Sequence, residues 1–219
     1  MKIFITGSES FIGGFLWKTL SAAGHELFGV DLAPPTRVGG VQMDLQNPAL
    51  ADQIPQSAAV IHLAAVSTDP LCKSDPLAAF AANISGTINV AQAAVARGAS
   101  QFIFASTEWV YGDVGNGGTQ PEELPIDITK MQGPYAASKI MGETVLRLSG
   151  ISNVTILRFG IVYGPRLKNW SAVESLVDKV YRDEPITVGS ARTSRKFINV
   201  GDLCSGILAS IGRSRSITD

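Results

Sequence analysis

The sequence predicts an α/β fold built on a doubly wound parallel sheet, and two patterns indicate it. Short runs of β-branched and aromatic residues alternate with longer helical segments along nearly the whole chain, as in sheets covered by helices on both faces. Glycine, acidic and hydroxyl-bearing motifs then fall just after the short runs, at the carboxyl ends of the predicted strands. In a doubly wound sheet, ligands bind at this edge, where the strand order reverses.

The first elements form a strand–helix–strand unit. A buried strand is expected at Lys2–Thr6 and a helix at Phe11–Ala23, which Gly24 ends. The second strand covers Leu27–Val30 and closes at Asp31, after which two prolines break the chain. This order is the beginning of a parallel sheet.

The later elements repeat the alternation. Further strands are expected from their apolar, β-branched composition at Val60–Leu63, Gln101–Ser106 and Val154–Phe159. Further helices are expected at Pro76–Arg97, Tyr135–Leu148 and Ala172–Arg182. Residues 112–118 carry four glycines, which predicts a flexible loop that is a candidate lid.

Composition limits the class of protein. A chain of 219 residues can bury one core and carry one extra lobe, and 45% hydrophobic with 17% charged residues is typical of globular proteins. The net charge of −1 predicts neither a nucleic-acid nor an anionic-membrane partner. Cys72 and Cys204 lie far apart, which favours a reducing compartment over a disulfide scaffold. No stretch approaches the ~20 apolar residues of a membrane span. We therefore expect a cytoplasmic protein, without a metal site.

The loop Gly7–Gly13 has the spacing of a dinucleotide-binding turn. Gly7 allows a tight turn, Gly13 allows close packing of helix on sheet, and the helix N-terminus then faces a pyrophosphate. Ser10 stands at the middle position, where glycine is usual, and its small hydroxyl could donate to a phosphate. The alternative is a strand-to-helix turn without a ligand.

Acidic and small residues follow the next strands. A carboxylate at Asp31 would accept hydrogen bonds from the adenosine ribose and repel a 2′-phosphate, which favours NAD over NADP. Arg37 is a counter-indication, because a cation there could accept that phosphate. Asp44 and Leu45 are candidates for contact with adenine. The sequence HLAA at residues 62–65 lets a flat cofactor lie against the backbone, while His62 itself is expected to be packed and hydrogen-bonded.

Tyr135 and Lys139 are spaced i, i+4 on a predicted helix and share one face. A tyrosine has a pKa of about 10, and a nearby ammonium together with a positive nicotinamide ring would stabilise its phenolate. Tyr135 could then take a proton from a substrate hydroxyl while a hydride leaves the same carbon, and Lys139 would bind the nicotinamide ribose. The alternative is a surface tyrosine beside a solvated lysine.

The strand end before this helix offers further polar groups. Thr107 is expected to face Tyr135 and share its proton path, with Ser106 against the nicotinamide. Glu108 and Trp109 are expected to point toward the substrate. Glu108 is interpreted as either a general acid or base or a solvated loop carboxylate.

These residues together resemble the extended short-chain dehydrogenase/reductases, in particular the UDP-glucose 4-epimerase-like members of the NAD-dependent epimerase/dehydratase family. The matching motifs, in order, are TGSESFIG, Asp31, HLAA, NISGT, STEWVYG, YAASK, RFGIVYGPR and RKFINV. The match spans residues 1 to about 212. Their order and spacing make the joint resemblance specific.

The resemblance implies a Rossmann-fold NAD-binding domain at residues 1–160. It also implies a small substrate-binding lobe at residues 161–219, interleaved with the core and truncated relative to relatives, and often a homodimer. The implied catalytic residues are Tyr135, Lys139 and Thr107. The implied cofactor-binding residues are Gly7, Ser10, Phe11, Ile12, Gly13, Asp31, Asp44, Leu45, Leu63, Ala64, Ala65, Asn83, Ser106, Tyr135 and Lys139. The implied substrate-binding residues are Ser67, Glu108, Trp109 and Arg195, with Arg195 on the substrate diphosphate.

The implied activity is epimerisation of a nucleotide sugar, in which Tyr135 deprotonates the C4 hydroxyl and hydride returns to the other face of a transient ketone. Three departures from the family pattern bear on this. Ser10 replaces a glycine, Ile161 replaces an asparagine that contacts the substrate, and Trp109 replaces a carboxylate that dehydratases need for elimination. The alternatives are an NAD-dependent ketoreductase or dehydrogenase acting on another sugar or lactone, and a non-catalytic dinucleotide-binding regulator.

Overall fold

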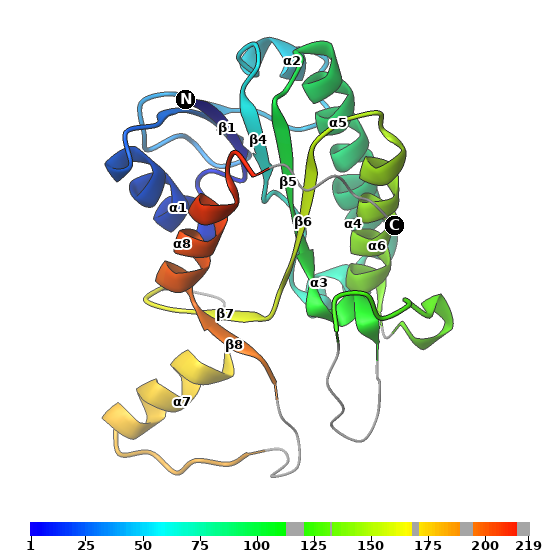
Figure 1. Cartoon of the computed structure of the whole chain (residues 1–219). Helices are drawn as coiled ribbons and strands as arrows, with labels where there is room; N and C mark the ends of the chain where they lie inside the picture. The colour runs from blue at the N-terminus through cyan, green and yellow to red at the C-terminus, as the bar shows by residue number, and fades with distance from the viewer. Residues whose placement is uncertain (113–120, 132, 168–170, 189–194, 214–219) are drawn as a thin grey trace.

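A computed structural model describes residues 1–112, 121–131, 133–167, 171–188 and 195–213 (Figure 1). Its strands are β1 (Lys2–Thr6), β2 (Glu26–Asp31), β3 (Gly40–Gln42), β4 (Ala59–His62), β5 (Gln101–Thr107), β6 (Val154–Phe159), β7 (Ile161–Tyr163) and β8 (Phe197–Asn199). Its α-helices are α1 (Phe11–Ala22), α2 (Leu50–Gln53), α3 (Asp69–Ser74), α4 (Pro76–Phe80), α5 (Gly86–Ala96), α6 (Pro134–Leu148), α7 (Ala172–Tyr181) and α8 (Val200–Ser210). A π-helical turn (Ala81–Ser85) joins α4 to α5, and short 3-10 turns lie at Glu108–Tyr111 and Ile128–Lys130.

Within the described residues, six strands form one parallel sheet in the order β3-β2-β1-β4-β5-β6. The chain starts in the middle, moves outward to β3, and then crosses back to β4 on the other side of β1. The order therefore reverses between β1 and β4, as in doubly wound nucleotide-binding folds. This confirms the predicted fold class.

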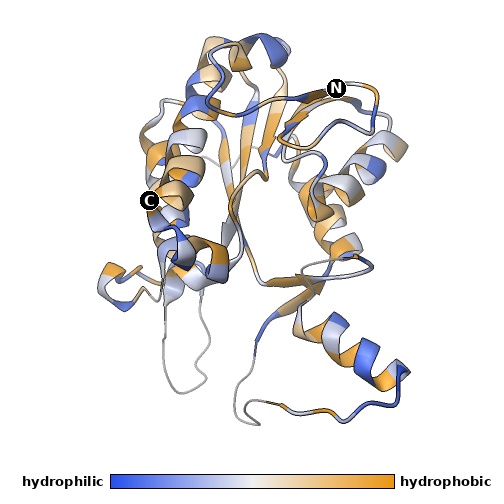
Figure 2. Ribbon diagram, turned by 180° about the vertical axis from the view of Figure 1, so that it is seen from behind, coloured by the Kyte–Doolittle hydropathy of each residue, from blue (hydrophilic) through white to orange (hydrophobic). Residues whose placement is uncertain are grey.

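The sheet is buried on both faces because successive side chains of a strand point to opposite sides. In β1, Ile3 and Ile5 pack against α1 and α8, whereas Phe4 packs against the α2, α5 and α6 side. All three side chains are fully buried. Figure 1 shows the two helical layers on either side of the sheet, and Figure 2 shows the hydrophobic colouring of the strands between them.

The predicted helix Pro76–Arg97 is continuous but not uniform. It runs as α4, then the π-helical turn, then α5. The wider turn contains Asn83, which is buried and holds a neighbouring loop, as described below. π-helical turns inside helices are frequent at functional sites. This departure from the predicted α-helix therefore indicates that the residues around Asn83 lie near one.

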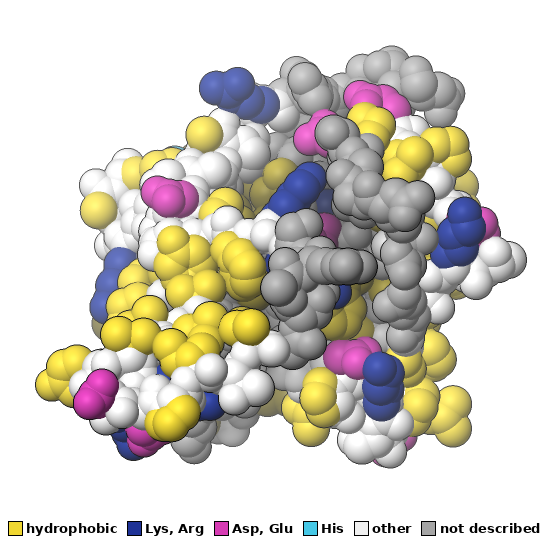
Figure 3. All heavy atoms as spheres, turned by 90° about the horizontal axis from the view of Figure 1, so that it is seen from below, with side chains coloured by type: hydrophobic (Ala, Val, Ile, Leu, Met, Phe, Trp, Pro, Cys, Tyr) yellow, Lys and Arg dark blue, Asp and Glu magenta, His cyan; other side chains and the backbone are white. Residues whose placement is uncertain are grey.

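The segment after β6 contributes both to the core and to a small lobe. Strands β7 and β8 form a separate parallel pair with α7 between them in sequence. α8 returns to the sheet and packs beside α1, so that Leu203 and Ile207 belong to the main core. In contrast, α7 has no buried residue, and Val180 and Tyr181 are exposed. Seen from below, the face that carries this lobe shows several patches of apolar side chains (Figure 3).

Two sequence predictions outside the site can be compared directly with the structure, and a third cannot. Cys72 and Cys204 are both buried and free. Among the described helices, none is long and apolar enough to cross a membrane. The candidate lid at residues 112–118 lies, apart from Gly112, outside the described residues.

The contact between α6 and β5 predicts the effect of a glycine substitution. A Cβ at Gly142 would lie 2.6 Å from Cζ of the buried Phe104. We expect Gly142→Ala to lower the free energy of unfolding by about 1–2 kcal/mol, because overpacking outweighs the gain in helix propensity. The measurement is denaturant unfolding.

The matched control is Gly206→Ala in α8, where an added Cβ meets nothing within 4 Å. This change should raise the free energy of unfolding by up to about 1 kcal/mol. A Gly142→Ala variant as stable as the original chain would contradict the packing described for α6.

Candidate functional site

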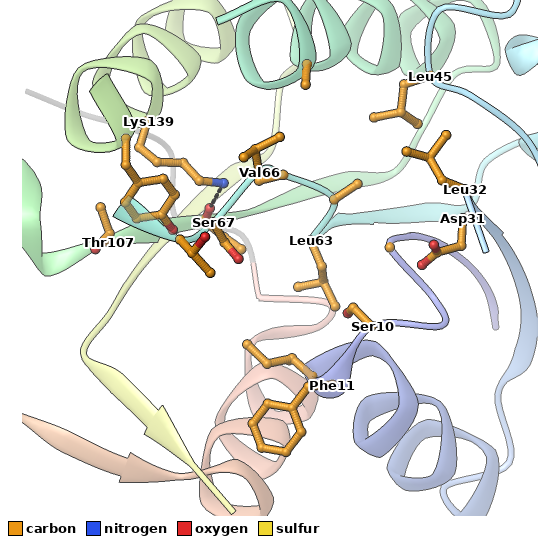
Figure 4. A pocket seen from close by; sticks show the side chains of 18 of the residues that line it. Ser10, Phe11, Asp31, Leu32, Leu45, Leu63, Val66, Ser67, Thr107 and Lys139 are labelled. Carbon is orange, nitrogen blue, oxygen red and sulfur yellow. Dashed lines mark hydrogen bonds between the residues drawn. The ribbon is translucent and has the colours of Figure 1, made fainter. Parts of the chain in front are cut away.

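A cavity of about 870 Å³ lies along the carboxyl edge of the sheet, where the strand order reverses. The predicted residues that line it are Gly7, Ser10, Phe11, Ile12, Asp31, Asp44, Leu45, Leu63, Ala64, Ala65, Ser67, Ser106, Thr107, Trp109, Tyr135 and Lys139. Figure 4 shows Ser10, Asp31 and Leu45 toward one end and Thr107, Ser67 and Lys139 toward the other. The predicted residues Gly13, Asn83, Glu108 and Arg195 are not part of the lining.

The loop from β1 to α1 brings backbone to the cavity wall. Gly7 has φ +73°, and a Cβ there would lie 2.9 Å from the backbone nitrogen of Ala64. A Cβ at Gly13 would lie 2.1 Å from the Gly7 carbonyl oxygen, so this glycine acts behind the wall by letting the helix approach the turn. Ser10 has φ −66° and needs no glycine; its Oγ accepts a hydrogen bond from Gly13 N at 3.0 Å and caps α1.

Asp31 ends β2 with its carboxylate fixed by two backbone donors. Oδ2 accepts from Glu9 N at 2.9 Å, and Oδ1 accepts from Ala33 N at 3.0 Å. Arg37, which the sequence suggested as a possible phosphate ligand, does not line the cavity. Its Nη1 donates instead to Glu9 Oε2 at 2.5 Å. The Asp31 carboxylate therefore lines the cavity, while the Arg37 guanidinium is bound to Glu9 outside the lining.

His62 is packed and hydrogen-bonded, as predicted. Its Nδ1 lies 2.6 Å from Thr6 Oγ1 and its Nε2 lies 3.0 Å from Thr87 Oγ1. Burial, with a contribution from the Lys139 charge, lowers the pKa of His62 to about 3. His62 is therefore a neutral side chain whose hydrogen bonds connect β4 to β1 and α5, and it does not act as a general base at neutral pH.

Asn83 supports the cavity wall from behind. Its Oδ1 accepts from Val66 N at 2.7 Å, and its Nδ2 donates to Val66 O at 3.0 Å and to Ser138 Oγ at 2.9 Å. The side chain thus joins the loop after β4 to α6. Sequence analysis assigned Asn83 to the cofactor, whereas the structure gives all three of these bonds to the protein.

Tyr135 and Lys139 lie on the first two turns of α6 and both line the cavity. Lys139 is buried, and its Nζ donates to Ala105 O at 2.8 Å and lies 5.9 Å from the centre of the Tyr135 ring. Burial lowers the pKa of Lys139 to about 8, against the opposing charges of Cys72 and Glu143.

The electrostatic prediction for Tyr135 involves two cations, the Lys139 ammonium and a bound nicotinamide ring, which together would stabilise the phenolate. Within the protein chain alone the pKa of Tyr135 is raised, first because burial disfavours the phenolate and second because of the Cys72 charge. The Lys139 ammonium alone does not outweigh this burial.

The strand end beside Tyr135 carries the remaining hydroxyls. Thr107 is buried, lines the cavity, and its Oγ1 accepts from Trp109 N at 3.3 Å. Ser106 also lines the cavity, but its hydroxyl donates to Glu143 Oε1 at 2.5 Å. Glu143 in turn forms an ion pair with Arg158 of β6 at 2.7 Å. Beneath the cavity, this network ties β5, β6 and α6 together.

The predicted substrate residues divide into two groups. Ser67 and Trp109 line the cavity, and the Trp109 ring meets Tyr135 edge-on at 6.3 Å between centres. Glu108 lies outside the lining, close enough to Lys196 and Arg195 for their charges to act on it. Burial nevertheless raises the pKa of Glu108 above its usual value, with these two cations opposing the shift.

Sequence analysis missed part of the cavity wall. Arg166 lines it from the chain after β7, and Leu32 and Val66 line it from the loops after β2 and β4. Ile161, which sequence analysis named at a position of substrate contact, lines it as well. Arg166 lies 4.5 Å above the Phe11 ring and 2.9 Å from a Glu174 carboxylate oxygen. The motif RFGIVYGPR contains Ile161 and Arg166 and was the signal that could have placed Arg166 here.

The residues present fit a dinucleotide. Gly7 lies close to the Ala64 backbone and has no side chain, so the backbone forms the cavity wall there. The N-terminus of the 12-residue helix α1 follows this turn. Asp31 offers an acceptor for ribose hydroxyls. The cavity volume of about 870 Å³ lies within the range of small-molecule and cofactor sites.

Comparison with known proteins agrees with this geometry. The chain matches the NAD dependent epimerase/dehydratase family model over residues 3–218. The protein belongs to this family, whose enzymes depend on NAD. This confirms the predicted family, the predicted cofactor and the predicted epimerase/dehydratase-type enzyme.

Individual relatives differ in the activity that they carry. The chain is 28% identical to an uncharacterized UDP-glucose epimerase of Bacillus subtilis, over 99% of this chain and 74% of that protein. It is 32% identical to a GDP-6-deoxy-D-mannose reductase of Pseudomonas aeruginosa, over 94% of this chain and 69% of that protein. The UDP-glucose 4-epimerase of Thermus thermophilus in complex with NAD superposes with a TM-score of 0.84 at 28% identity, covering 97% of this chain and 75% of that one.

The lowered pKa of Lys139 predicts how stability depends on pH. The folded-state pKa of about 8 lies below the ordinary value of 10.5, so between these values the unfolded chain binds more protons. The Lys139 contribution therefore makes the folded state more stable as the pH rises from about 8 to about 10.5, by up to about 1.4 kcal/mol per pH unit. Lys139→Met lacks this contribution. Its stability relative to the original chain should fall over the same window, as urea unfolding at several pH values would measure.

The control is Lys18→Met, because Lys18 is exposed on α1. Its stability difference from the original chain should stay constant with pH. A Lys139→Met difference that is equally flat would show that the ammonium is not held in a buried environment.

Proposed function

We propose that the protein is an NAD-dependent nucleotide-sugar epimerase that acts by transient oxidation of a sugar hydroxyl, with C4 as the reacting position. One observation carries this proposal: Lys139 and Thr107 lie toward one end of the cavity and Asp31 toward the other (Figure 4). Tyr135 lies beside Lys139, and the Gly7 turn is hydrogen-bonded to Val30, next to Asp31. A proton acceptor for the hydroxyl oxygen and a hydride acceptor for the carbon that carries it can thus reach the same alcohol group.

Each residue of the catalytic end has a distinct task in the proposal. Tyr135 Oη takes the proton of the sugar hydroxyl, and Thr107 Oγ1 hydrogen-bonds the same oxygen. Lys139, fixed by Ala105 O, supplies positive charge and a donor to the nicotinamide ribose. NAD, when bound, accepts the two electrons of the C–H bond as hydride. Because the ketone must present both faces before it is reduced again, the site needs walls that allow the sugar to turn.

The substrate end supports a nucleotide sugar. Trp109 offers an aromatic wall beside Tyr135, and Ile161 adds an apolar surface. Arg195 and Lys196 lie near Glu108, at the start of the turn that also carries Trp109. Their positive charge near this end would favour binding of a diphosphate. The relatives named for UDP-glucose and for a GDP-linked sugar bind substrates of this class.

A second candidate is a reductase of a nucleotide-linked keto sugar. The relative with 32% identity favours it, since that protein is a GDP-6-deoxy-D-mannose reductase. The two activities differ in their balance of electrons. An epimerase returns its cofactor to the starting state and needs none added once loaded, whereas a reductase consumes one reduced cofactor for each product.

The role of Tyr135 gives the direct test of catalysis. With UDP-glucose and UDP-glucuronic acid as probes, Tyr135→Phe should lower turnover by at least about a hundredfold, because general acid–base groups contribute 10²–10⁴-fold. The dissociation constant for NAD should change little, since the phenyl ring remains in place. Turnover by product chromatography and NAD binding by calorimetry measure the two effects.

Tyr181→Phe is the matched control, because Tyr181 lies exposed on α7 away from the cavity. It should leave both quantities unchanged. Turnover of Tyr135→Phe at the original level would remove Tyr135 from the mechanism. With these probes, formation of NADH in proportion to an oxidised product would favour the reductase working in reverse. An original chain that binds NAD but turns over neither probe would favour a regulator.

A further inference from the structure

Glu9 lies in the loop between β1 and α1, but it does not line the cavity. Thr36 Oγ1 donates to Glu9 Oε2 at 2.6 Å, and Arg37 Nη1 donates to the same oxygen at 2.5 Å. Arg37 Nη1 also donates to Ser8 O at 3.2 Å. The Glu9 side chain is 7% exposed and that of Arg37 is 22% exposed. The guanidinium is therefore held against the back of the loop.

Glu9 also contacts Asp31 through its backbone. Its N–H donates to Asp31 Oδ2, while Ala33 N donates to Oδ1. Glu9 thus fixes the Asp31 carboxylate through its backbone N–H and binds the Arg37 guanidinium through its side chain. Although burial acts to raise it, the hydrogen bonds from Thr36 and Arg37 hold the pKa of Glu9 below its usual value, so its carboxylate is ionised at neutral pH.

The charges around this corner decide which dinucleotide is accepted. NADP differs from NAD by a phosphate on the adenosine ribose, which needs cationic or N–H donors. Between Asp31 and Met43, Arg37 is the one Lys or Arg in the sequence. Two backbone donors, Glu9 N and Ala33 N, lie at the corner as well, and Asp31 occupies both. The Arg37 guanidinium and these two backbone donors are thus each already bound to a carboxylate.

We propose that Glu9 is a specificity-determining residue that makes the protein select NAD over NADP by holding Arg37 away from the adenosine ribose. Asp31 and Glu9 act together: Asp31 occupies the backbone donors and Glu9 occupies the cation. The inference rests on the proposed function for one point, namely that the adenosine ribose lies beside Asp31. It predicts that either acidic residue alone maintains part of the selectivity.

The test measures the dissociation constants of NAD and NADP by calorimetry for a set of variants. Glu9→Gln keeps the shape of the side chain and removes its charge. It should lower the dissociation constant of NADP about fivefold, because a negative charge is removed and Arg37 is released. The dissociation constant of NAD should change less than about twofold. Asp31→Ala should tighten NADP relative to NAD about tenfold by freeing the two backbone donors.

The double variant gives the decisive comparison. Glu9→Gln with Asp31→Ala should improve NADP binding more than the product of the single effects, because the freed backbone donors and the freed guanidinium then serve one phosphate. Adding Arg37→Met to Glu9→Gln should remove the gain. Glu26→Gln is the charge-matched control, since Glu26 is exposed at the opposite end of β2.

The outcomes separate this inference from the proposed function. Suppose that Glu9→Gln leaves the ratio of the NAD and NADP dissociation constants unchanged while Asp31→Ala shifts it. Glu9 then only stabilises the loop and the inference is overturned, although the ribose placement stands. If Asp31→Ala also leaves the ratio unchanged, the ribose placement itself is wrong. Should Glu9→Gln fold poorly, as thermal unfolding would show, Arg37→Met in the Asp31→Ala background must abolish the NADP gain, and a gain that persists overturns the inference.

Discussion

The site depends on a buried ammonium fixed to the end of a strand. Lys139 reaches from α6 across to β5, where its Nζ donates to Ala105 O at 2.8 Å. This bond requires α6 to lie close to the sheet, and Gly142 allows that approach because any larger side chain would meet Phe104. The same closeness places Tyr135 over the end of β5. The packing of one helix on one strand thus sets the position of the proposed catalytic groups.

Burial shifts the pKa values of Lys139 and Tyr135 in opposite directions. These shifts would link proton transfer to cofactor binding. Burial lowers the pKa of Lys139 to about 8 and raises that of Tyr135 above its usual value. The chain alone therefore keeps Tyr135 as a neutral phenol. A second positive charge beside the ring would be needed for the phenolate to form near neutral pH. In the proposed mechanism, this arrangement would confine proton abstraction to the state in which a hydride acceptor is also present.

The sequence predicted the fold well because parallel strands and their helices carry strong, local patterns, and the glycine loop, Asp31, Tyr135 and Lys139 all reach the predicted edge. The sequence could not show what depends on three-dimensional competition. In the protein chain alone the pKa of Tyr135 is raised by burial, and the Asn83 amide is hydrogen-bonded to the Val66 backbone. Arg166 reached the cavity through the β7–β8 lobe, whose short strands have too little periodicity to be recognised.

The most direct measurement is the ultraviolet titration of Tyr135, taken as the tyrosinate absorbance of the original chain minus that of Tyr135→Phe, with and without NAD. The account predicts a pKa above about 10 in the protein alone, where burial dominates. With NAD it predicts a decrease of at least about two units, which Lys139→Met reduces. A pKa already near neutrality without NAD, or one that NAD does not move, would contradict the account.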